Sequence, residues 1–170
     1  MFSGSNEKKV VIALGSNLGD SRRVLREAMR RLQQFSDKPM VGSSLWRTEP
    51  VDCPPGSPEF VNAVVEFEAE GGETPETLLG KLQALEMEFG RVPKKVSNEP
   101  RALDLDILMF GRETRSSSAL TIPHPRAHLR RFVLEPLSEI DPTLKLPGQS
   151  CTVRELLQRL PETPRAKRLG

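Results

Sequence analysis

The order of its apolar stretches constrains the fold of this chain more than any other feature of the sequence. Four stretches rich in β-branched and other apolar residues are typical of strands, and two stretches with helical spacing lie between the first and second and between the third and fourth. In chain order we predict a strand at 9–17, a helix from Asp20 or Ser21 to Phe35, strands at 40–50 and 60–70, a helix from Thr74 to Gly90, and a strand at 101–111. Strand, helix, strand, strand, helix, strand is the split βαβ order. We therefore predict an α+β, ferredoxin-like fold with an antiparallel or mixed sheet and helices packed on it.

Each predicted helix has a start signal and one apolar face. The first begins at Asp20 or Ser21, and the second has Thr74 as N-cap, Pro75 in its first turn and Gly90 at its end. Their buried faces are predicted to be Val24, Leu25, Ala28, Met29, Leu32 and Phe35 in the first helix, and Leu78, Leu82, Leu85 and Phe89 in the second.

The remaining segments are predicted to complete a single domain over residues 1–170. A short final helix begins at Thr152, where Thr152 and Glu155 form a capping box. We expect residues 1–8 and about 161–170 to be frayed tails, and we find no linker that would separate a second domain.

Composition narrows the possible partners. The net charge is only +2, which does not indicate a nucleic-acid partner. Five arginines on the first helix could form a nucleic-acid stripe, but a solvated face is the better interpretation because no aromatic residues interleave with them. No apolar run is long enough to span a membrane. The two cysteines, Cys53 and Cys151, match no metal or redox spacing, so we expect them to be free thiols in a reducing compartment. We expect a cytoplasmic protein that is a monomer and binds no nucleic acid or membrane.

Two aspartates in the predicted strand at 101–111 need an explanation, because Asp is disfavoured in strands. Strand side chains alternate between faces, so Asp104 and Asp106 point the same way, about 7 Å apart. Two such carboxylates can share one or two Mg²⁺ ions. The alternative is that the strand lies at the sheet edge with one face exposed to solvent, and that the two aspartates are simply solvated.

Basic segments on both sides of the pair favour a polyphosphate ligand. The segment 90–102 carries Arg91, Lys94, Lys95 and Arg101, and the segment 124–132 carries His124, Arg126, His128, Arg130 and Arg131. The spacing of His124 and His128 allows zinc, but no third ligand is evident, and phosphate donors fit these surroundings better. No P-loop, dinucleotide fingerprint or protein-kinase signature is present, so metals and scattered cations would have to hold any nucleoside triphosphate.

Two other classes compete on these features alone. A metal-dependent nucleotidyltransferase or nuclease could use the aspartate pair, although it would more naturally show an extended basic surface and a third acidic ligand. A ferredoxin-like RNA-binding or small-molecule regulatory module would use the sheet face, but it leaves the two aspartates unexplained.

Five segments in register carry a family resemblance. "ALGSNLGD", "SSLWRTEPVD", "FVNAVVEFEA", "RALDLDILMFG" and "IPHPRAHLRRFVLEPL" together resemble the 6-hydroxymethyl-7,8-dihydropterin pyrophosphokinases of folate biosynthesis, from about residue 10 to 160. The resemblance implies a ferredoxin-like fold and transfer of pyrophosphate from ATP to the pterin hydroxymethyl group, giving AMP and the pterin diphosphate. It also implies two Mg²⁺ ions held by Asp104 and Asp106.

The same resemblance implies roles for further residues. The pterin is expected between the rings of Phe60 and Phe132. Hydrogen bonds to its edge are expected from Thr48, Asn62 and the backbone near Val51. From the sequence alone, core packing is the simpler role of both phenylalanines. Arg91 and Arg101 are expected to stabilise charge on the phosphates as catalytic residues. ATP is expected to contact Leu79, Gln83, Glu86, Arg91, Arg101, Ile107, Thr121, His124 and Arg130. The chain departs from the family at Pro93, at Asn98 and at Phe60, which replaces a tyrosine.

Overall fold

The computed structural model describes residues 8–49, 56, 58–90, 102–162 and 165–169. The elements are β1 (Lys9–Ser16), α1 (Ser21–Leu32), η2 (Gln33–Phe35), β2 (Val41–Gly42), β3 (Trp46–Thr48), β4 (Phe60–Glu68), α2 (Pro75–Glu88), β5 (Asp104–Phe110), β6 (Arg115–Ser116), β7 (Thr121–Ile122), η3 (Ala127–Leu129), α3 (Arg131–Ile140), α4 (Val153–Gln158) and β8 (Ala166–Arg168).

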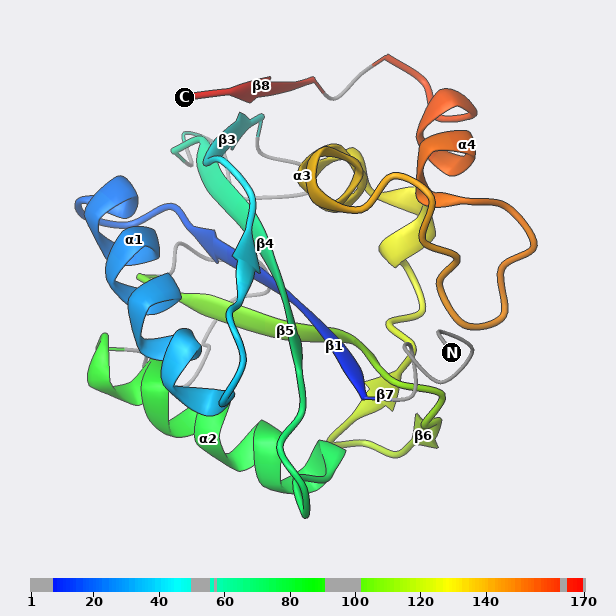
Figure 1. Cartoon of the computed structure of the whole chain (residues 1–170). Coiled ribbons are helices and arrows are strands. Elements are labelled where there is room, and N and C mark those ends of the chain that lie inside the picture. The colour runs from blue at the N-terminus through cyan, green and yellow to red at the C-terminus, as the bar shows by residue number, and fades with distance from the viewer. Residues whose placement is uncertain (1–7, 50–55, 57, 91–101, 163–164, 170) are drawn as a thin grey trace.

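One sheet organises the described part of the chain. Its strands lie in the order β5-β1-β4-β3-β8, with β2 also paired to β4, and every pairing is antiparallel (Figure 1). The first predicted strand, β1, is therefore central, and the aspartate-bearing β5 lies at the edge. This arrangement confirms the predicted α+β fold with an antiparallel sheet and helices packed on it.

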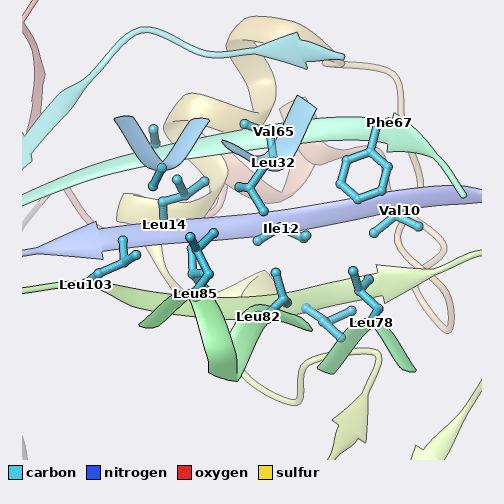
Figure 2. Close-up of a cluster of buried hydrophobic side chains, with 14 of the residues drawn as sticks. Val10, Ile12, Leu14, Leu32, Val65, Phe67, Leu78, Leu82, Leu85 and Leu103 are labelled. Carbon is cyan, nitrogen blue, oxygen red and sulfur yellow. The ribbon is translucent and has the colours of Figure 1, made fainter. Parts of the chain in front are cut away.

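Helices cover both faces of the sheet. Leu32 of α1 and Leu78, Leu82 and Leu85 of α2 pack on one face, against side chains such as Ile12 (Figure 2). The opposite face packs against α3 and α4, in a second buried cluster. Strands β1 and β4 are thus buried on both sides, which explains why their sequences are almost continuously apolar. None of the described helices is both long and apolar enough to cross a membrane.

The predicted helix caps are confirmed. The side chain of Asp20 accepts a hydrogen bond from the Arg23 N–H, and Thr74 caps α2. Thr152 and Glu155 form the reciprocal capping box of α4. Gly90 follows α2 with a φ of +87°, a conformation that favours glycine.

The predicted strand at 40–50 is interrupted, so that prediction was wrong in part. Strands β2 and β3 are separated at residues 43–45. There the buried Ser43 donates its N–H to the Val64 carbonyl at 2.9 Å and accepts the Val64 N–H on its hydroxyl at 2.9 Å. A side chain thus replaces one backbone acceptor, and the strand can break without leaving the Val64 N–H unsatisfied.

Helix α3 and strand β8 were not predicted, and neither were the short elements β6, β7 and η3. Helix α3 contains Pro136, and a proline inside a segment normally predicts that a helix ends there. Strand β8 lies inside the predicted frayed tail at 161–170, where Trp46 and Thr48 pair with Arg168 and Ala166. The tail prediction was wrong for these residues because β3 offers unpaired backbone groups that a further strand satisfies. Residues 1–7 lie outside the described residues.

Candidate active site

The two aspartates occupy the same face of β5. Leu103, Leu105 and Ile107 belong to the core under α1 and α2, so the intervening Asp104 and Asp106 point to the opposite face. Both carboxylates are partly exposed, and their neighbours on β1 are Gly15 and Ala13 respectively. One strand therefore presents two carboxylates beside the two positions of β1 that carry the smallest residues, Ala13 and Gly15.

A row of cross-strand neighbours connects Asp104 to an amide. Gly15 pairs with Asp104 on one side and with Asn62 on the other. A Cβ built at Gly15 would lie 3.2 Å from Asn62 Oδ1 and 3.8 Å from the ring of Phe60. Gly15 is itself buried, and its lack of a side chain lets Asn62 Oδ1 and the Phe60 ring lie close to the β1 backbone, in the strand position next to Asp104.

The amide of Asn62 is held in place by β3. Its Nδ2 donates to Thr48 Oγ1 at 2.7 Å, and both side chains are buried. Thr48 pairs in register with Phe60, whose ring is only half buried. Buried polar side chains of this kind are specific hydrogen-bonding partners for a polar ligand edge.

The start of α3 brings a ring and a cation to the same face of the sheet. The Arg130 guanidinium lies over the Phe132 ring, 5.3 Å from its centroid. Burial lowers the pKa of Arg130, and the charges of Asp106 and Asp104 partly offset that effect. The guanidinium thus lies within electrostatic reach of the aspartates and remains a cation.

His124 is the second donor that the structure brings to the aspartates. Its backbone N–H donates to the Leu108 carbonyl at 3.0 Å, and its ring Nδ1 accepts the backbone N–H of Arg126 at 3.1 Å. Burial, then Arg130 and Arg126, lower the pKa of His124, while Asp104 opposes them. With Nδ1 accepting, the neutral ring carries its proton on Nε2, which can donate to an anionic ligand.

The residues present fit magnesium better than zinc. A zinc site on His124 and His128 needs further ligands, and no group of three or more His, Cys, Asp or Glu that could hold a metal occurs among the described residues. Magnesium needs only one or two protein carboxylates when phosphate oxygens and water complete its shell, and the aspartate pair meets that requirement.

Several predicted ATP contacts lie on the other face of the sheet. Ile107 is buried in the core under α1 and α2, Leu79 packs against that core, and Gln83 is exposed on α2. Glu86 is 6% exposed, and its Oε2 accepts the Leu105 N–H at 2.8 Å. These residues flank the α2 side of β5, whereas Asp104, Asp106, Arg130 and His124 flank its α3 side.

The remaining predicted site residues are outside this group or outside the described residues. Thr121 is exposed on β7, and its hydroxyl donates to the Ser117 carbonyl at 3.4 Å. Val51, Arg91 and Arg101 lie outside the described residues.

Gly15 is the site feature that the sequence analysis missed. Its signal was present, because a glycine near the end of a β-branched strand often marks a close approach of another group.

Comparison with known proteins points to one family. The family model described as 7,8-dihydro-6-hydroxymethylpterin-pyrophosphokinase (HPPK) matches residues 11–142. The 2-amino-4-hydroxy-6-hydroxymethyldihydropteridine pyrophosphokinase of Haemophilus influenzae is 42% identical over 149 residues, covering 87% of this chain and 90% of that protein. The enzyme of the same name from Bacillus subtilis is 42% identical over 130 residues, covering 76% of this chain and 75% of that protein.

Solved structures agree on the fold. An HPPK-DHPS chain crystallised in complex with substrates superposes with a TM-score of 0.68 at 14% identity over 88% of this chain. The present chain spans 42% of that longer chain, so the likeness concerns the fold of one part of it.

Proposed function

Since this chain belongs to the 7,8-dihydro-6-hydroxymethylpterin-pyrophosphokinase family, and is thus a pterin pyrophosphokinase of folate synthesis, we propose that ATP is its pyrophosphate donor. The products are then AMP and 6-hydroxymethyl-7,8-dihydropterin diphosphate. The observation that carries the proposal is the row Asn62, Gly15, Asp104, which places a polar recognition group and a carboxylate pair on the same face of three adjacent strands, two positions apart across the sheet.

The pterin subsite lies at the Asn62 end of this row. Asn62 and Thr48 bond the polar edge of the heterocycle, and Phe60 and Phe132 take its two faces. Loss of a hydrogen-bonding group from the ligand would leave these buried partners unpaired, which is how such a site discriminates between heterocycles. We assign the backbone near Val51 to the same subsite from the family resemblance.

The carboxylates of Asp104 and Asp106 hold two Mg²⁺ ions in this proposal. Bound there, Mg²⁺ supplies positive charge that offsets both the carboxylates and the triphosphate of ATP. Placement on an edge strand that is hydrogen-bonded to β1 along its length keeps the two ligands rigid, so little reorganisation is needed when substrates arrive.

ATP is proposed to wrap the outer edge of β5. Its phosphates face Arg130 and the Nε2–H of His124 on the α3 side, with Thr121 nearby in sequence. Its adenosine part faces the α2 side, where the proposed contacts are Leu79, Gln83, Glu86 and Ile107. Because β5 is the edge strand, a ligand can reach both sides without crossing the sheet.

The transfer needs no covalent enzyme intermediate. The pterin hydroxyl oxygen attacks the β-phosphorus of ATP, the bond from that phosphorus to the α–β bridging oxygen breaks, and AMP leaves as the hydroxyl proton is lost. Positively charged side chains stabilise the charge on the phosphates as it redistributes. Arg130 is one such group, and Arg91 and Arg101 are proposed as the others.

The test is product analysis with purified protein, ATP, Mg²⁺ and 6-hydroxymethyl-7,8-dihydropterin. We expect AMP and the pterin diphosphate in equal amounts, and no turnover in excess EDTA. The variants Asp104→Asn and Asp106→Asn should each reduce kcat by at least about 100-fold, because each removes a metal ligand. Asp37→Asn, at an exposed position, is the matched control and should keep full activity.

Two outcomes would overturn the proposal. ADP in place of AMP would show transfer of a single phosphoryl group. Undiminished turnover in EDTA, or in both aspartate variants, would refute the metal site while leaving the donor and products to stand or fall on the product analysis.

A further inference from the structure

Glu139, near the end of α3, holds the segment that leads into β3. Its two carboxylate oxygens accept the Ser44 N–H at 3.0 and 3.2 Å. Its Oε2 also accepts the Ser44 hydroxyl at 2.6 Å, and its Oε1 accepts the indole N–H of Trp46 at 2.9 Å. Both oxygens of one carboxylate are therefore used by residues 93 and 95 positions away in the chain.

The carboxylate makes these bonds in its ionised form. Burial opposes its ionisation, but the hydrogen bonds from Ser44 and Trp46, with the charge of Arg168, hold the pKa of Glu139 below its ordinary value. Hydrogen bonds to an ionised acceptor are roughly twice as strong as those between neutral groups.

Helix α3 connects this carboxylate to the proposed pterin subsite. Phe132 and Glu139 are seven residues apart, which places them on nearly the same helix face and about 10 Å apart along the axis. On the other side of the contact, Trp46 pairs with Asn62 and Thr48 pairs with Phe60. The Glu139 contact thus joins the helix that carries one ring to the strand that fixes the amide.

We propose that Glu139 is a positioning residue for the pterin: it fixes β3 against α3, so that Thr48 and Asn62 face Phe132 at the separation that the heterocycle needs. This role rests on the proposed pterin subsite and involves no contact between Glu139 and the substrate. Without the carboxylate, the pterin itself would have to order β3 on binding, and that cost appears in its affinity.

The kinetic test compares Glu139→Gln with Glu135→Gln. The control removes the same charge from the same helix, where Glu135 pairs with Arg131 at 3.5 Å and not with β3. For Glu139→Gln we expect KM for the pterin to rise about 10-fold, with kcat within about twofold and KM for ATP unchanged, because only the ordering of one subsite is lost. Glu135→Gln should leave all three parameters near wild type.

Trp46→Phe provides a second route to the same contact. It keeps an aromatic ring but removes the indole N–H that Glu139 accepts. We expect a smaller rise in pterin KM, and a double variant less impaired than the product of the two single effects, because both substitutions act on one contact.

Fluorescence gives a readout that does not depend on turnover. Trp46 is the single tryptophan of the chain, so emission reports directly on the indole beside Glu139. In Glu139→Gln the emission maximum should shift, and titration with 6-hydroxymethylpterin should show binding weakened by the same factor as KM. Neither change should occur in Glu135→Gln.

The outcomes separate this role from the proposed function. Wild-type turnover with an unchanged pterin KM in Glu139→Gln overturns the positioning role alone, as does an equal rise in KM for both substrates or an equal effect of Glu135→Gln. A wild-type protein that neither turns over nor binds the pterin overturns the function and this role together.

Discussion

Among single residues, Glu66 of β4 has the most unusual surroundings. Lys9 Nζ lies 3.4 Å from its Oε1 and 3.0 Å from Oδ2 of Asp141, the residue that follows α3. Within the described residues, Glu66 Oε2 is buried and has no hydrogen-bond partner as a carboxylate. As a carboxylic acid it can donate to Asp141. Burial, followed by the hydrogen bond and charge of Asp141, raises the pKa of Glu66 to about 7, although Lys9 opposes this.

This pKa predicts that stability falls as the pH rises. The folded state keeps the Glu66 proton that the unfolded state loses near 4.5, so the contribution is fully present below pH 4.5 and is lost as the pH rises through 7. Over this range we expect a loss on the order of 1–3 kcal/mol in the free energy of unfolding. Urea denaturation at several pH values between 4.5 and 8 measures it.

The pH effect is isolated by comparison with Glu66→Gln, which keeps a neutral side chain throughout. The difference in unfolding free energy between wild type and this variant should change with pH. Taking this difference cancels the contribution of His124, which both proteins share and whose lowered pKa favours stability at higher pH. Glu68→Gln, on the same strand but exposed beside Lys38, is the matched control. A pH-independent difference for Glu66→Gln would refute the prediction.

At the scale of elements, β5 combines an edge position with a buried acceptor. Glu86 of α2 accepts the Leu105 N–H, a group that the edge strand cannot bond to a sheet neighbour. The register with β1 shifts between Val11 and Ile12, so an extra residue of β5 lies beyond the aspartates. These two features let β5 present Asp104 and Asp106 on one face and then continue with buried residues on both.

We predict that Glu86→Met destabilises the protein by about 1–3 kcal/mol, because it leaves the buried Leu105 N–H without this acceptor. Urea denaturation at pH 7 measures the loss. Glu88→Met changes a residue on the same helix as Glu86 and removes an exposed ion pair with Arg31 of α1, so it should have a much smaller effect.

The same variant separates two roles of Glu86. Loss of stability with an unchanged KM for ATP would assign Glu86 to β5 alone, whereas a raised KM for ATP would support its proposed contact with the nucleotide. An unchanged stability would contradict the prediction.

For the molecule as a whole, the C-terminal strand β8 closes one side of the sheet beside the pterin subsite. The Leu169 N–H donates to the Leu45 carbonyl at 2.8 Å. Lys167, two residues before Leu169, pairs with Arg47 of β3. Since the direction of N–H groups repeats every two residues, the Lys167 N–H also points to β3. The end of the chain thus supports the strand that carries Thr48.

Lys167→Pro should therefore weaken the sheet where Lys167→Ala does not. Proline removes the N–H, and we expect a loss of about 1–2 kcal/mol in unfolding free energy and a raised KM for the pterin. Lys167 is exposed, so the alanine variant should resemble wild type in both respects. Equal behaviour of the two variants would show that β8 contributes nothing to β3.

The elements with strong local signals could be predicted from the sequence. Periodicity and caps identified β1, α1, β4, α2 and β5 because these signals involve residues within one or two turns of each other. The break at 43–45, helix α3 and strand β8 could not be predicted. The first depends on Ser43 meeting Val64, the second on packing that overrides Pro136, and the third on the open edge of β3.

The sequence by itself determined the α+β fold class and the order of β1, α1, β4, α2 and β5. It also determined the placement of Asp104 and Asp106 on one face, because alternation along a strand is a local property. Only the tertiary structure decided which distant residues meet. The register of β1 between β4 and β5 puts Gly15 between Asn62 and Asp104, and the packing of α3 puts Glu139 on Ser44 and Trp46. Such contacts depend on many weak interactions across the whole chain, and no local pattern encodes them.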